Sequence, residues 1–165
     1  MPHQFLNRTL LDTDEKDKKR YFLFKTSFDE RHPLDEVPPE ILVEWCQQSN
    51  SAESWGNIAS AIFPFHNGNE EVQLSAQAVA ILESAPDPIP VVEAFLSRIS
   101  PNSWSGSRAG IMMQRRLALE SLLKHKNPAI VEAIALGVKT AKVYEDKVRD
   151  AERKENEEGE QTFEL

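Results

Sequence analysis

The stretch LESAPDP at residues 82–88 returns as LLKHKNP at residues 122–128, 40 positions later. In both copies an apolar run ends, Asp87 or Asn127 follows, and a proline comes next. Asp and Asn are preferred helix N-caps, and proline fits the first turn of a helix because its missing N–H is not needed there. The stretch therefore predicts, twice, the end of one helix and the start of the next.

Apolar residues recur at helical spacing on both sides of these junctions, whereas no stretch alternates apolar and polar residues as a half-buried strand would. We therefore expect an all-α protein with six helices between residues 38 and 150. The first covers 38–49, the second runs from an N-cap at Ser51 to near Pro64, the third carries Leu74 to Ala85, the fourth opens at Pro88, the fifth runs from about Ser107 to Lys124, and the sixth begins at Asn127 and Pro128.

Six helices in sequence form three antiparallel pairs, and a period near 40 residues with two helices per unit is typical of an α-solenoid. Over residues 38 to 145 the chain resembles the HEAT-like (armadillo-like) family of helical repeats. From Trp104 onward it is also similar to C-terminal helical-repeat segments of large bacterial multidomain proteins. The resemblance implies a right-handed solenoid of about three hairpins that serves as a binding scaffold, usually within a larger molecule.

The two ends differ in composition from the repeats. Residues 1–37 are expected to form an N-terminal capping segment with a helix near 14–27, because aromatic residues such as Tyr21 and Phe24 need cover. Residues 38–150 are the predicted repeat domain. The acidic segment 151–165 is predicted to be a flexible tail, with the sixth helix fraying near Gly159.

Bulk composition excludes several classes of protein. The 165 residues suit a single domain. The net charge of −8 argues against general nucleic-acid binding, because such affinity comes mainly from clustered Lys and Arg. One cysteine, no leader-like N-terminus and no apolar run near the roughly 20 residues of a membrane span predict a cytoplasmic protein that does not enter the membrane.

No constellation of residues predicts catalysis. The four histidines are scattered, without the i, i+4 spacing of a helical metal site, so we expect no metal and no cofactor. Cys46 lies beside Trp45 on an amphipathic helix, where a thiol usually acts as a small buried hydrophobe. The sequence therefore predicts that the chain is not an enzyme.

The segment Trp104-Ser105-Gly106-Ser107-Arg108 is the most unusual local sequence. Small residues at a helix start leave N–H groups that an anion can use, although the Gly-Lys-Ser/Thr ending of a P-loop is missing. The other interpretation is a tight turn in which Ser105 or Ser107 caps the helix and Trp104 packs across the joint between repeats.

Arg115 and Arg116 make the fifth helix the most basic element, together with Arg108. They either pair with Glu120 and carboxylates of the sixth helix or form a docking patch for an acidic partner or nucleic acid. The candidate interaction surface predicted from the sequence comprises Trp104, Ser105, Ser107, Arg108, Arg115 and Arg116.

Together these patterns predict a noncatalytic protein-interaction or scaffold module that docks a protein partner or another domain of a longer chain. An apolar patch should then be exposed on an open end or on the concave face of the stack. The alternative is anion, nucleotide or nucleic-acid binding through the basic fifth helix and the Trp-Ser-Gly-Ser segment before it.

Overall fold

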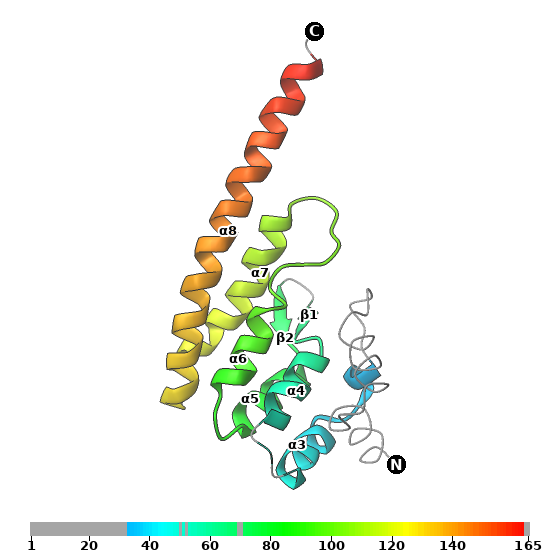
Figure 1. Cartoon of the computed structure of the whole chain (residues 1–165), viewed down its shortest axis with the longest axis vertical. Helices are drawn as coiled ribbons and strands as arrows, with labels where there is room; N and C mark the ends of the chain where they lie inside the picture. Colours follow the sequence, from blue (N-terminus) through cyan, green and yellow to red (C-terminus); the bar gives the residue numbers. More distant parts are fainter. Residues whose placement is uncertain (1–32, 50, 52, 69–70, 164–165) are drawn as a thin grey trace.

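The computed structural model describes residues 33–49, 51, 53–68 and 71–163. Within these ranges the chain is mostly helical, as the sequence predicts, and carries one small sheet (Figure 1). The helix predicted near residues 14–27 lies outside them. The elements are η1 (Pro33–Glu36), α3 (Pro39–Gln48), α4 (Glu53–Ala61), β1 (Phe65–Asn67), β2 (Val72–Leu74), α5 (Ala76–Ser84), α6 (Ile89–Leu96), α7 (Arg108–Glu120), η2 (Ser121–Lys124) and α8 (Pro128–Phe163); η1 and η2 are 3₁₀ helices.

The two repeated junctions are helix starts, as predicted, although α6 begins at Ile89, with Pro88 as its N-cap, one residue later than expected. The Asp87 carboxylate accepts a hydrogen bond from the Ile89 N–H at 3.0 Å, before α6. The Asn127 side chain accepts one from the Ala129 N–H, also at 3.0 Å, at the start of α8. Each side chain satisfies an N–H group that has no partner within its helix.

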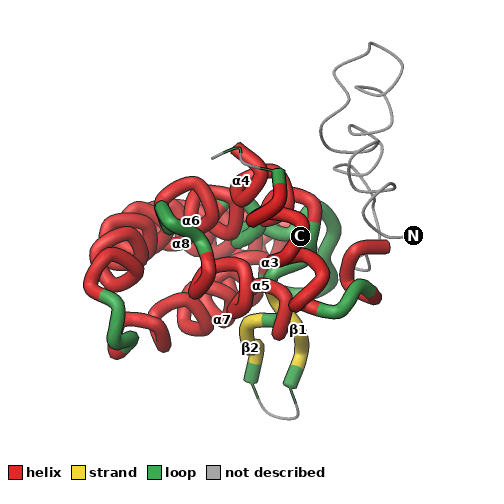
Figure 2. Tube along the Cα trace, turned by 90° about the horizontal axis from the view of Figure 1, so that it is seen from below, coloured by secondary structure: helices red, strands yellow, loops and turns green. Residues whose placement is uncertain are grey.

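The ribbon between α4 and α5 corrects the prediction of a chain without strands. β1 and β2 pair antiparallel, with Phe65 opposite Leu74, and lie at one edge of the helices (Figure 2). Leu74, expected on the third helix, is therefore in a strand, and α5 begins only after its N-cap Ser75. Three-residue strands are too short to produce the alternation from which a strand is recognised.

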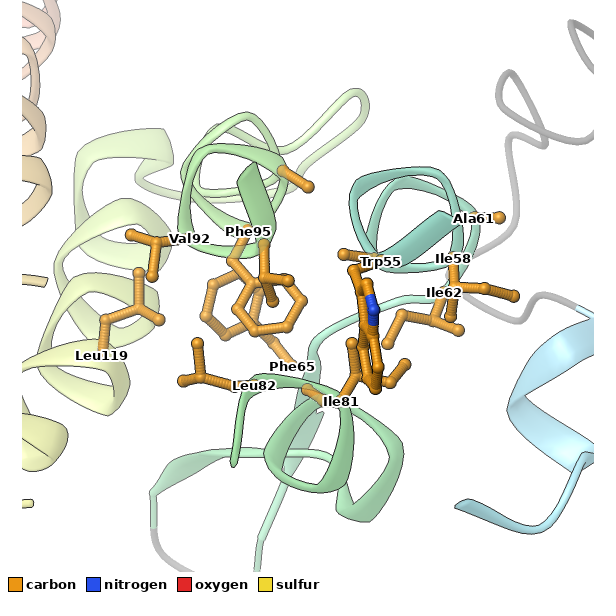
Figure 3. Packing of buried hydrophobic residues seen from close by; sticks show 14 of the residues in the cluster. Trp55, Ile58, Ala61, Ile62, Phe65, Ile81, Leu82, Val92, Phe95 and Leu119 are labelled. Carbon is orange, nitrogen blue, oxygen red and sulfur yellow. The ribbon is translucent and has the colours of Figure 1, made fainter. Parts of the chain in front are cut away.

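The core lies mainly between helices that are separated by one other helix along the chain. α3 packs on α5, α4 on α6, and α6 on α8, while α7 packs along α8. Figure 3 shows the centre, where Trp55 of α4, Ile81 of α5 and Phe95 of α6 point toward one another. Burial of these large apolar side chains is the main stabilising contribution to the stack.

The last residues of the predicted capping segment pack against the helices. Leu34 is buried, and the Asp35 carboxylate accepts a hydrogen bond from the Phe63 N–H at 3.1 Å. The Gln77 amide donates to the backbone oxygens of Asp35 and Val37. Segment 33–37 is thus tied to α5 and to the residues that follow α4.

α8 has 36 residues, about 54 Å of helix at 1.5 Å per residue, and its C-terminal half projects beyond the other elements (Figure 1). The helix runs to Phe163, through most of the segment 151–165 that the sequence predicts as a flexible tail with fraying near Gly159. Arg153 pairs with Asp150 and Glu157, one turn away on either side. Pairs at this spacing support a helix without tertiary contacts.

Candidate interaction surface at the start of α7

The loop between α6 and α7 leads the chain into the predicted surface (Figure 1). Gly106 has a φ of 77°, in the left-handed region that glycine adopts without strain, and a Cβ there would meet no atom within 4 Å. The glycine is therefore required by the turn and not by crowding. Trp104 comes two residues earlier and is 49% exposed.

Arg108 holds Trp104 and Tyr144 together at this surface. Its guanidinium carbon lies 4.9 Å from the centroid of the Trp104 ring, within the range of a cation–π contact. One of its terminal nitrogens donates to the Tyr144 hydroxyl at 3.4 Å and to Ser100 Oγ at 2.7 Å. Tyr144, on α8, is 48% exposed. We call Trp104, Arg108 and Tyr144 the Trp104 cluster.

The start of α7 is capped from within the molecule. Ser107 is the N-cap, as one of the two predicted serines, and its hydroxyl accepts from the Gly110 N–H at 2.9 Å. The Glu152 carboxylate of α8 accepts from the N–H groups of Arg108 at 2.6 Å and Ala109 at 3.2 Å, and from the Ser107 hydroxyl at 2.8 Å. The groups that an external anion would use already bind a carboxylate of this chain.

These contacts shift the pKa of Glu152. Burial raises the pKa of a carboxyl group, but the hydrogen bonds from Ser107, Ala109 and Arg108 favour the charged form and outweigh it. The net pKa lies below its ordinary value. Glu152 is therefore ionised at neutral pH, where its charge is favourable beside the positive end of the α7 dipole.

Arg115, for which the sequence left internal pairing or a docking patch open, is buried and therefore does not belong to the predicted interaction surface. Its guanidinium donates to the backbone oxygen of Arg98 at 3.0 Å. The guanidinium carbon lies 5.1 Å from the Phe63 ring centroid and 5.7 Å from that of Phe65. Arg115 thus joins α7 to the aromatic residues around β1, because its planar cation can stack on rings while its N–H groups bind a carbonyl.

Arg116 is also buried, and it forms the internal pairing predicted as one of the two alternatives. It binds Glu120 on its own helix and Glu145 of α8, the latter at 2.6 Å. Burial raises the pKa of Glu145, but the hydrogen bond and the charge of Arg116 lower it by more. The net pKa is therefore below the ordinary value. Lys142 and Arg149 also pair with Glu145.

The structure therefore brings Trp104, Ser107 and Arg108 together at one surface and removes Arg115 and Arg116 from it. Ser105 is exposed in the loop beside them. Sequence reasoning missed three residues of α8 that contact this region: Tyr144, Glu145 and Glu152. One signal was available, since Glu145 and Glu152 lie seven residues apart, on the inward face that includes Val138.

Other reactive groups lie apart from this surface. Cys46 is buried, and burial raises its pKa to about 12, so the thiol stays protonated. His125 contacts Glu83 at 3.2 Å. Within the described ranges, no group of three or more His, Cys, Asp or Glu side chains is placed to hold a metal ion. No described helix combines the length and the apolar character needed to cross a bilayer.

Comparison of the chain with protein-family models, curated proteins and solved structures finds no match. The likeness to helical repeats therefore rests on the pattern of residues, and it stays a prediction.

Proposed function

We propose that this chain is a noncatalytic, cytoplasmic protein-interaction module, built as a right-handed α-solenoid of about three hairpins, that docks a protein partner through the Trp104 cluster. The observation that carries the proposal is a half-exposed tryptophan held by an arginine beside an exposed tyrosine. Trp, Tyr and Arg are the residue types enriched among those that dominate binding energy at protein interfaces.

The order of helix contacts supports a solenoid. In a stack of hairpins each helix packs on the helix two positions later, which is the relation of α3 to α5, α4 to α6, and α6 to α8, whereas α7 packs on α8 and β2. The repeat also keeps its register. Pro90 of α6 contacts Gly56 of α4, and Arg98, just after α6, donates to the Ser60 carbonyl of α4. The residues 40 positions later, Ile130 and Val138 of α8, are buried.

The preorganised geometry of the cluster favours a protein partner. Arg108 lies over one part of the Trp104 ring, and Ser100 and Tyr144 fix the guanidinium. Side chains that are already ordered lose little conformational entropy on binding, so more of their contact energy appears as affinity. By contrast, an anion at the start of α7 would have to displace Glu152.

The first prediction concerns Trp104. We expect Trp104→Ala to weaken binding to a protein partner by about 2 kcal/mol or more, roughly thirty-fold, because an exposed aromatic anchor loses its contact area. The measurement is capture from the native cell with quantitative mass spectrometry, followed by titration of the captured protein against the purified chain.

Ile89→Ala is the matched control, since Ile89 is a similarly exposed apolar residue at the start of α6, away from the cluster. A protein captured by the wild type and by Ile89→Ala, but lost with Trp104→Ala, supports the proposal. Equal capture by all three chains would show that the cluster is not the docking surface.

A further inference from the structure

The outer face of α8 exposes two large apolar residues on one line. Leu136 is 73% exposed and Val143 is 54% exposed. They are seven residues apart, so they lie on the same face of the helix, about 10 Å apart along its axis. Isolated apolar residues are common on surfaces, but two that are aligned along one helix form a strip that another helix can cover.

The 40-residue repeat in the sequence indicates that this face suits packing against another helix. Leu96 of α6 lies 40 positions before Leu136, and it packs directly over Gly137 of α8, where an added Cβ would collide with its Cδ1 atom. Leu136 on α8 is therefore the repeat equivalent of Leu96 on α6, the residue through which α6 contacts α8. No further helix of the described chain covers it.

Two charged residues flank the apolar pair on the same face. Glu132 precedes Leu136 by one turn, and Lys147 follows Val143 by one turn. Neither forms an ion pair within the described part of the chain. The face therefore reads, from its N-terminal end, as Glu132, Leu136, Lys139, Val143 and Lys147, with an acid at one end, a base at the other and Lys139 between the two apolar residues.

This order is symmetric about one point. The midpoint between Leu136 and Val143 falls between residues 139 and 140, and the midpoint between Glu132 and Lys147 falls at the same place. A two-fold interface requires this property, because residue i of one copy contacts residue j of the other and the reverse contact forms at the same time. A helix of unrelated sequence would not require it.

We propose that α8 pairs antiparallel with α8 of a second copy of this chain, about a two-fold axis beside Lys139 and Thr140. In this register Leu136 packs against Val143 of the second copy, and Glu132 faces Lys147 of the second copy. Each contact forms twice. The pairing buries the exposed apolar strip and neutralises four charges. Val143 precedes Tyr144 on α8, so this face adjoins the Trp104 cluster.

The same register places the two copies of Lys139 near the axis, where their like charges oppose association. Lys139→Ala is therefore expected to tighten the dimer, whereas other changes on this face should weaken it. Because Lys139→Ala should lower the dissociation constant while the other changes raise it, this variant tests where the two-fold axis lies and not merely whether an apolar surface is present.

The first test is the oligomeric state of the full chain, by sedimentation equilibrium over a wide range of concentrations. We expect a monomer–dimer equilibrium for the wild type. Leu136→Glu should raise the dissociation constant roughly hundredfold, because it places two unpaired carboxylates in the contact. Ile89→Glu, on α6, is the control and should leave the equilibrium unchanged, and circular dichroism checks that both variants fold.

The second test exchanges charges. Glu132→Lys and Lys147→Glu should each weaken self-association, because each opposes like charges across the axis, while an equimolar mixture of the two variants should form a heterodimer with the affinity of the wild type. A wild type that stays monomeric at all concentrations would overturn the proposal. So would a dimer that tolerates Leu136→Glu, or a mixture in which the two variants associate no better than alone.

Discussion

At the residue scale, Glu152 completes a helix to which it does not belong. Its carboxylate binds two N–H groups and the N-cap hydroxyl of α7, although it lies on α8, 44 residues after Arg108. A helix start has N–H groups without internal partners, and a carboxylate satisfies them while its charge complements the dipole. One side chain thus caps α7 and also holds the middle of α8 against it.

The second prediction follows from the pKa of Glu152. In the unfolded chain a glutamate titrates near pH 4.3, and the folded pKa is lower, so the stabilisation is present above about pH 4.3 and is lost as the pH falls through the folded pKa. Glu152→Gln should therefore lower the free energy of unfolding by about 1 kcal/mol at pH 7, and the difference from the wild type should shrink below about pH 4.

Urea unfolding followed by circular dichroism between pH 7 and pH 3 measures this difference. Glu155→Gln is the control, because Glu155 is an exposed carboxylate on the same helix. A constant difference between Glu152→Gln and the wild type across this pH range would contradict the assignment.

At the scale of elements, α7 and α8 are joined by charges that are largely out of water. Glu145 is fully buried, and Arg116, Lys142 and Arg149 surround it. A buried ion pair contributes little net stability compared with apolar residues, since desolvation offsets the attraction, but breaking it leaves a charge without compensation. The network therefore favours one register of α8 against α7.

The third prediction is a double-mutant cycle on this pair. Arg116→Met should cost about 3 kcal/mol, at the lower end of the range for a broken buried pair because Lys142 and Arg149 still face Glu145. Glu145→Leu should cost a similar amount. The double variant should be clearly more stable than the sum of the two losses predicts, as urea unfolding measures. Additive losses would show that the two side chains do not act as a pair.

At the scale of the whole molecule, the packing of the helices depends on how closely neighbouring helices such as α6 and α8 approach each other. Gly137 lets α8 come near α6, because Leu96 fills the space that a Cβ would take. The core of the described chain is continuous from α3 to α8, so a change at this joint affects the packing of α8 against the rest of the core.

The fourth prediction tests this joint. Gly137→Val should lower the free energy of unfolding by roughly 1 to 3 kcal/mol, because the added methyl groups overpack against Leu96. In a Leu96→Ala background the same change should cost clearly less, since space has been made for it. Ala151→Val, at an exposed position of α8, measures the cost of a β-branched residue alone. Equal costs in both backgrounds would place the strain elsewhere.

Local patterns of the sequence were enough to predict most helices and several of their ends. Asp87, Asn127 and Ser107 act on N–H groups within three residues of themselves, so their roles do not depend on distant parts of the chain. The ribbon at 65–74 escaped this reasoning because its strands are too short to show a period.

By itself the sequence determined the mostly helical class and the repeated helix starts, which follow from neighbours along the chain and from helical period. For Arg116 it left two alternatives, and the structure shows the pairing with Glu120 and Glu145. Only the tertiary structure decided which charged groups are buried and which are exposed. Arg115 and Arg108 are seven residues apart on one helix, yet one stacks on Phe63 and Phe65 inside while the other holds Trp104 and Tyr144 outside. The physical reason is that burial depends on what lies across from a residue, and residues distant in sequence supply it.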